Sequence, residues 1–192
     1  QAKQPAGIVY ITPMNRPDAL LALSMLYALE GKREARTASV AITGGSLGAA
    51  AVCDVLLRFY FGTGAFLNSN RVLPVGLSAA GQLPPDSPAV KAVLEHRNEK
   101  GQDAYPREVR RVSDTSEFRA QVRNALTGQP NGNVTVVLSA KPDDLLRTLE
   151  LPSVRELVTA KVKLLIAVEH GTGDLAELRK AWPTPIITAG AE

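Results

Sequence analysis

The sequence is poor in cysteine and histidine, and this scarcity excludes several kinds of site. There are one cysteine and two histidines among 192 residues. A single cysteine cannot form an internal disulfide, and a structural zinc site needs about four cysteine or histidine ligands. Cys53 lies in the apolar run AAAVCDVLL, which predicts a buried thiol that packs in the core.

Long apolar runs and an excess of charge of one sign are also missing. No run reaches the ~18 to 20 residues that span a bilayer, so no membrane partner is expected. The formal net charge is +3 and the basic residues are scattered, which gives little support for nucleic-acid binding. The composition, 45% hydrophobic and 21% charged, indicates a globular protein with the length of one domain, residues 1–192.

The first residue is Gln1 rather than methionine, and residues 1–7 (QAKQPAG) are expected to form a flexible leader. Two explanations stay open: an exported protein whose signal peptide is missing from this chain, or a cytoplasmic protein that has been trimmed. An apolar strand is expected shortly before Glu192, and we expect a longer protein to continue beyond it.

Short apolar runs alternate with longer segments of helical periodicity. The predicted strands are Ile8–Thr12, Ser39–Thr43, Val72–Gly76, Val134–Leu138, Val162–Val168 and Ile186–Thr188. The predicted helices are a leucine-rich stripe from Leu20 to Leu29, then Leu47–Tyr60, Ala89–His96, Ser116–Leu126, Pro142–Leu149 and Asp174–Ala181. This alternation predicts a doubly wound, mostly parallel sheet with helices on both faces, a Rossmann-like α/β core. Nearly continuous apolar strands should be covered on both faces.

Residues 81–111 are polar and rich in proline, glutamate, lysine and arginine. We interpret them as an insertion with one helix rather than as a second domain. In parallel sheets, ligands bind beyond the carboxyl ends of the strands. The segments that matter are therefore Thr12–Asp18, Thr43–Gly48, Ser139–Asp144 and Glu169–Asp174.

Each of these segments has a structural and a functional interpretation. Gly44, Gly45 and Gly48 can serve a tight strand-to-helix turn, or they can admit a phosphate to a helix N-terminus. Asp143 and Asp144 suit the first turn of a helix, and they can also form a carboxylate pair.

His170, at the end of an apolar strand, is either a loop histidine or a site residue on the ligand side. Ser46 in GGSLG superficially resembles a nucleophile elbow, but no oxyanion loop precedes it, and we reject a catalytic triad.

The first strand and its loop carry a resemblance to a known family. VYITPMNRPDALLAL has the frame of the nucleoside hydrolases (inosine-uridine preferring N-ribohydrolases and their bacterial relatives), in which a strand ends in D-x-D-P-G-x-D-D-A or D-x-G-N-E-x-D-D-A. Asn15 matches the asparagine of the second form, Asp18 an aspartate and Ala19 the alanine. The resemblance implies the family's α/β fold.

Later segments are similar to the same family over most of the chain. SVAITGG resembles its second strand, which ends in Gly-Asn, and the region around KPDDLLRTL resembles its G-P-x-T-N-L-A helix. KVKLLIAVEHG lies where the family has a strand ending in M-G-G, and WPTPIITAGAE resembles a Trp-Pro-x-Pro strand. The chain thus resembles a degenerate, truncated member.

The resemblance implies a calcium site, and this sequence departs from it. In the family, clustered aspartates bind a calcium ion that holds the ribose hydroxyls and the attacking water, and one aspartate acts as general base. Here the loop offers Thr12, Asn15 and Asp18, with Arg16 where an acid is expected. Calcium needs several oxygen ligands, and a guanidinium would repel it. We therefore expect no metal and no cofactor, with Asp18 as the ligand and calcium as the ion if the family site persists.

Three hypotheses follow. The first is a nucleoside hydrolase-like protein that binds a nucleoside, ribose or other small polar ligand at Thr12, Asn15, Arg16, Gly44, Gly45, Asp143 and Asp144 without standard turnover. The second is an active N-ribohydrolase with an altered site, in which Asp18 and His170 are catalytic and Asp143 or Asp144 can supply an acid. The third is a nucleotide-binding protein that uses the Gly44–Gly48 turn for phosphate. A small molecule is the expected partner, and homo-oligomerisation stays open.

Overall fold

The computed structural model describes residues 4–62, 75–79, 81–168 and 172–190. The strands are β1 (Ala6–Thr12), β2 (Ala35–Ile42), β3 (Val75–Leu77), β4 (Ser116–Glu117), β5 (Val134–Leu138), β6 (Val162–Val168) and β7 (Ile186–Ala189). The helices are α1 (Pro17–Gly31), α2 (Leu47–Phe61), α3 (Pro88–Leu94), α4 (Phe118–Thr127), α5 (Asp143–Leu149), α6 (Val154–Lys161) and α8 (Ala176–Ala181), with a 3-10 turn at Val112–Asp114.

The strands form one seven-stranded sheet in the order β4-β3-β2-β1-β5-β6-β7, and every strand pair is parallel. The predicted doubly wound α/β class is therefore confirmed. The chain winds outward from β1 in one direction and then outward from β5 in the other. The order reverses between β1 and β5, and this switch point is where open α/β sheets bind ligands.

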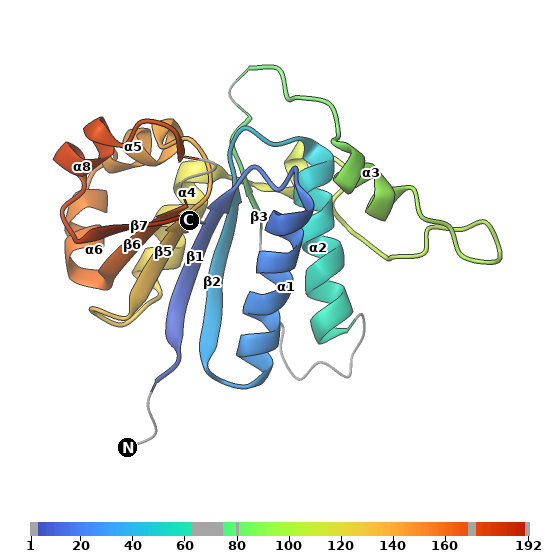
Figure 1. The fold of residues 1–192 in the computed structure, drawn as a ribbon, viewed down its shortest axis with the longest axis horizontal. Coiled ribbons are helices and arrows are strands. Elements are labelled where there is room, and N and C mark those ends of the chain that lie inside the picture. The colour runs from blue at the N-terminus through green and yellow to red at the C-terminus, as the bar shows by residue number, and fades with distance from the viewer. Residues whose placement is uncertain (1–3, 63–74, 80, 169–171, 191–192) are drawn as a thin grey trace.

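Helices lie on both faces of the sheet (Figure 1). On one face, Tyr10 of β1 belongs to the same buried cluster as Leu23 of α1 and much of α2. On the other face, Val9 and Ile11 belong to a cluster that includes Phe118 of α4 and buried residues of α5, α6 and α8. Successive residues of β1 thus point into two separate cores, which is why this strand is apolar throughout.

The cover is uneven, and this corrects two expectations. Strand β6 is interior, but its Leu164, Ile166 and Val168 are only half-buried, because the described helices next to β6 all lie on the opposite face. The helix α1 was expected to bury a broad stripe. Only Leu23 and Tyr27 of α1 are buried, and the rest of its leucines are half-buried or exposed.

Several element limits differ from the predictions. Strand β1 starts at Ala6, so Ala6 and Gly7, which were assigned to the leader, belong to the sheet. Gly7 donates its N–H to the carbonyl of Asn133 at 3.1 Å, which sets this start. Strand β2 begins four residues earlier than the predicted Ser39, and part of the predicted strand Val72–Gly76 lies outside the described residues. The two-residue β4 and the helix α6 were not predicted.

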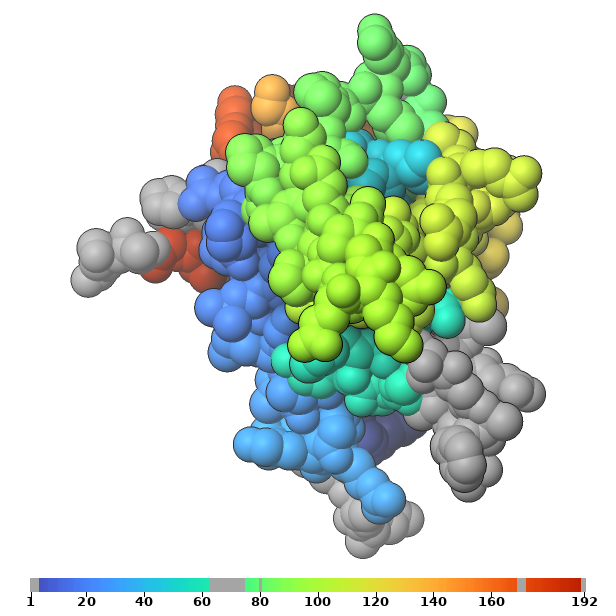
Figure 2. Space-filling view, turned by 90° about the vertical axis from the view of Figure 1, so that its right-hand side faces the viewer, coloured from blue at the N-terminus to red at the C-terminus, as the bar shows by residue number. Residues whose placement is uncertain are grey.

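The segment 81–111 contains α3 and runs across the outer side of α2 (Figure 2). Asp54 on α2 binds the carboxyl-terminal end of this segment. One carboxylate oxygen of Asp54 accepts from Nε of Arg58 at 2.9 Å, and the other accepts from the backbone N–H groups of Glu108 and Val109. The helix α2 is consequently enclosed between the sheet and this segment.

Cys53 lies on this enclosed helix and is buried, as its apolar surroundings predicted. Burial raises the pKa of its thiol far above the usual range, so the reactive thiolate is suppressed. None of the described helices is long and apolar enough to span a bilayer.

Candidate functional site

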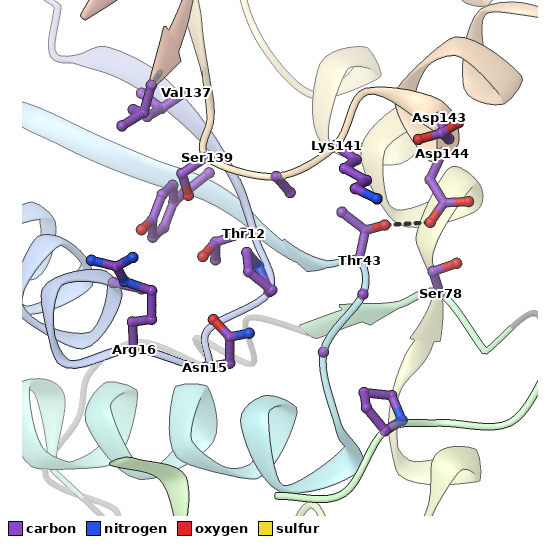
Figure 3. Close-up of a pocket in the computed structure, with 18 of the residues that line it drawn as sticks. Thr12, Asn15, Arg16, Thr43, Ser78, Val137, Ser139, Lys141, Asp143 and Asp144 are labelled. Carbon is purple, nitrogen blue, oxygen red and sulfur yellow. Dashed lines mark hydrogen bonds between the residues drawn. The ribbon is translucent and has the colours of Figure 1, made fainter. Parts of the chain in front are cut away.

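A cavity of about 710 Å³ lies at the switch point, beyond the carboxyl ends of β1 and β5 (Figure 3). We call it the switch-point cavity. Its walls come from the loops after β1, β2, β3 and β5, from the first turns of α1 and α5, and from Gln82, Leu83 and Pro84 of the segment 81–111. Segments that lie far apart in the sequence therefore form one concave site, as expected for a doubly wound sheet.

The predicted site residues that the structure describes all line this cavity. They are Thr12, Asn15, Arg16, Asp18, Gly44, Gly45, Asp143 and Asp144. The two loops after β1 and β2 are in contact, because the N–H of Thr43 donates to the carbonyl of Thr12 at 3.2 Å. The remaining candidate, His170, lies outside the described residues.

The loop after β1 is held by its own side chains. Thr12 is fully buried, and its hydroxyl oxygen accepts from the backbone N–H of Met14 at 3.0 Å. Met14 has a positive φ of 49°, and its side chain is buried in the core. The buried side chain of Met14 therefore anchors the loop in the core, and Asn15 and Arg16, which follow it, line the cavity.

Arg16 and Asp18, two residues apart in the loop, form an ion pair in which Nε and Oδ1 are 2.9 Å apart. Burial by itself would raise the pKa of Asp18, but hydrogen bonds from Arg16 and from backbone N–H groups outweigh it, so this pKa is lowered. Both side chains are largely exposed, at 61% and 66%, and such pairs contribute little to stability.

The glycine turn after β2 is explained by packing. A Cβ on Gly45 would lie 2.3 Å from the carbonyl oxygen of Pro13, and a Cβ on Gly48 would lie 2.3 Å from a carboxylate oxygen of Asp86. Ser46 caps the helix α2 by accepting from the N–H of Ala49. A phosphate at this helix start would meet the carboxylate of Asp86, so the geometry weighs against the nucleotide-phosphate hypothesis for this turn.

On the opposite side of the cavity, Asp144 joins two loops. Its carboxylate accepts a hydrogen bond from the hydroxyl of Thr43, drawn dashed in Figure 3, and lies 3.5 Å from the guanidinium of Arg147. Asp143, next to it, is exposed. The two aspartates therefore do not act as a pair, since Asp144 is engaged in the wall of the cavity.

Several residues of the site were not predicted from the sequence. Tyr10 lines the cavity floor; burial raises its pKa, and hydrogen bonding with Ser139 and Thr12 opposes this rise. Lys141 and Arg147 add two cations. Ser139 and Lys141 lie within a segment that was singled out, and Tyr10 is the one residue in its apolar strand with a hydroxyl on an aromatic ring.

The residues present do not fit a calcium ion. Among the described residues, no group of three or more histidine, cysteine, aspartate or glutamate side chains could hold a metal. Of the possible oxygen ligands in the first loop, Thr12 is bonded to Met14 and Asp18 is paired with Arg16. A hard cation needs several free oxygen ligands, and this loop offers mainly Asn15.

No model of a known protein family and no curated protein matches this sequence. Solved structures do match the fold. The plant nucleoside hydrolase PpNRh1 superposes with a TM-score of 0.55 at 17% identity, over 97% of this chain and 60% of the enzyme. The purine-preferring ribonucleoside hydrolase from Gardnerella vaginalis gives 0.57 at 12% identity, over 96% and 60% of the two chains.

A third match is the type III effector protein XopQ, solved in complex with adenosine diphosphate ribose, with a TM-score of 0.56 at 14% identity. It covers 88% of this chain and 44% of the effector. The chain thus spans less than two thirds of each of these structures. At such low identity the likeness concerns architecture, and with the seven-stranded parallel sheet it shows that this chain has a nucleoside hydrolase-like fold.

Proposed function

We propose that this chain binds a small polar ligand that contains ribose in the switch-point cavity, and that it has lost calcium-dependent cleavage of nucleosides. The observation that carries the proposal is the composition of the cavity wall. Hydroxyl and amide side chains from four loops line it: Asn15 after β1, Thr43 after β2, Ser78 after β3 and Ser139 after β5. Such groups can exchange hydrogen bonds with the hydroxyls of a sugar.

The apolar residues that line the cavity indicate the class of ligand. The cavity also has apolar lining residues, Ala19, Ala22 and Val137, which pack in the same cluster as Tyr10. An apolar wall next to convergent polar groups is typical of small-molecule sites. It suits a flat ring joined to a sugar, and both hydrolases with this fold are described as acting on nucleosides or ribonucleosides.

Loss of turnover is the second part of the proposal. Hydrolysis of a glycosidic bond by water requires a base or a metal-bound water near the reacting carbon. Asp18 is neutralised by Arg16, and Asp144 is engaged by Thr43 and Arg147. An active N-ribohydrolase stays the alternative, because Asp18 and Asp144 do line one cavity and His170 lies beyond the described residues.

Calorimetric titration with ribose, adenosine, inosine, uridine and adenosine diphosphate ribose tests binding. We expect at least one of these to bind, and Asn15→Ala to weaken that binding several-fold because it removes an amide at the rim. Asn124→Ala, an exposed change in α4 away from the cavity, is the matched control. If none of the five compounds binds, the proposal fails.

Calcium and a reducing-sugar assay separate the two functions. Any ligand that binds the folded state raises its melting temperature by mass action. We expect calcium to leave the melting temperature unchanged, and no ribose to be released from the nucleosides. Micromolar calcium binding, with ribose release that Asp18→Ala abolishes, would establish the hydrolase instead.

A further inference from the structure

Lys141 stands at the switch-point cavity without an ionic partner among the described residues. It follows Ser139 by two positions, where the chain leaves β5, and it is exposed. In Figure 3 its ammonium end points toward the cavity near Thr43. An unpaired ammonium beside a concave polar site is a ready partner for an anion.

The two acids nearest in sequence do not neutralise Lys141. Asp144 accepts from the hydroxyl of Thr43 and lies 3.5 Å from Arg147. Asp143 forms no ion pair with any described residue, although it is only two positions away. The positive charge of Lys141 therefore remains available to a ligand.

Arg16 supplies a second cation from the loop on the other side of the switch point. Its Nε is paired with Asp18, while its two terminal nitrogens form no hydrogen bond with the described residues. A guanidinium has five N–H donors, so its terminal nitrogens can donate to a hydroxyl of the ligand while Nε keeps its pair with Asp18.

From the position of Lys141 we infer that the ligand of the switch-point cavity carries a phosphate monoester, bound by Lys141. The inference rests on the proposed function and narrows it. The apolar residues, the hydroxyl groups and Arg16 contact the ring or the sugar, and the ammonium group of Lys141 binds the phosphate. A nucleoside monophosphate or a ribose phosphate therefore binds more tightly than the neutral nucleoside or sugar.

The test is calorimetric titration of the whole chain with two matched pairs, adenosine against adenosine monophosphate and ribose against ribose 5-phosphate. We expect the phosphorylated member to bind about ten- to a hundredfold more tightly, as for one or two charge-assisted hydrogen bonds. Added salt should reduce this preference. The pair with the larger preference identifies whether a nucleotide or a sugar phosphate is the ligand class.

Lys141→Met removes the charge and keeps the length of the side chain. It should abolish most of the preference for phosphate, measured as the ratio of the dissociation constants of the two members of a pair. Lys163→Met is the matched control, because Lys163 is exposed at the amino end of β6, away from the cavity. Equal binding of the members of each pair, or an unaltered preference in Lys141→Met, overturns this inference and leaves the proposed function standing. Failure of all four compounds to bind overturns this inference, and the titrations with inosine, uridine and adenosine diphosphate ribose then decide the proposed function.

Discussion

Asp54 is a buried charged residue that binds the end of the segment 81–111, the segment that also lines the cavity. Its side chain is nearly enclosed, with the whole residue 7% exposed, and both oxygens accept hydrogen bonds. Arg58 also contacts the carboxylate of Glu108 at 2.9 Å. Because the segment 81–111 contributes Gln82, Leu83 and Pro84 to the cavity, the hold of Asp54 on its far end helps to fix one wall of the site.

We predict that Asp54→Asn lowers the free energy of unfolding by about 2–4 kcal/mol, because it leaves buried donors poorly satisfied and Arg58 without its charge partner. Denaturant unfolding measures the change, and limited proteolysis should show faster cleavage within residues 81–111. Glu177→Gln, in an exposed pair with Lys180, is the control and should cost less than ~1 kcal/mol. Equal stability of the two variants would contradict the role given to Asp54.

Single residues of the site could be predicted only where their chemistry is visible in the sequence. Asp18, Asn15 and Asp144 are polar residues that follow apolar strands, and such positions face the ligand side of a parallel sheet. The engagement of Asp144 by Thr43 could not be predicted, since the two residues belong to loops that only the folded sheet brings together.

At the scale of elements, the loops after β1 and β2 are fitted to each other. Gly45 is the point of closest approach, and a side chain there has no room beside the carbonyl of Pro13 and the side chain of Ile42. The same contact places the first loop, with Asn15 and Arg16, against the second, with Thr43. The glycine at this position is therefore a requirement of the cavity's shape.

We predict that Gly45→Ala destabilises the protein by about 1–3 kcal/mol and weakens ligand binding, because both loops must move apart. Gly31→Ala is the control: it is at the end of α1, nothing lies within 4 Å of the added Cβ, and it should be neutral or slightly stabilising. Chemical denaturation and calorimetry check both variants. Unchanged stability and unchanged binding in Gly45→Ala would disprove the close fit.

The elements that pack centrally were the predictable ones. The strands β5 and β6 have the limits that their β-branched runs predicted, Val134–Leu138 and Val162–Val168. Strand β4 has only two residues at a sheet edge and no apolar run, so no periodicity could indicate it. The helix α6 has a short and mixed sequence, VRELVTAK, which begins at a serine with positive φ and lacks a side-chain cap.

At the scale of the whole molecule, the right-handed winding decides which surfaces are covered. Strands that advance from β1 to β3 place α1 and α2 on one face, and strands that advance from β5 to β7 place α5, α6 and α8 on the other. On the face that α1 and α2 cover, the described residues therefore leave β6 and β7 only partly covered. Hydrophobic composition alone predicts burial of every apolar strand and could not anticipate this asymmetry.

We predict that the double change Leu21→Glu and Met25→Lys on α1 alters the unfolding free energy by less than about 0.5 kcal/mol. Both side chains are exposed, at 62% and 58%, and the new charges are placed to attract one turn apart. Binding of an apolar dye to the folded protein should fall. Leu23→Glu is the contrasting variant, because Leu23 is fully buried and a charge there should prevent folding. Strong destabilisation by the double change would mean that this side of α1 is covered.

The position of β1 at the middle of the sheet also has a consequence for biosynthesis. Its neighbour β2 follows after one helix, so this pair can form soon after both leave the ribosome. Its other neighbour is β5, and the pairing of Gly7 with Val134 must wait until most of the chain has been made. During that interval the free edge of β1 is exposed as a template for pairing with other chains, so the nascent protein should depend on chaperones until β5 arrives.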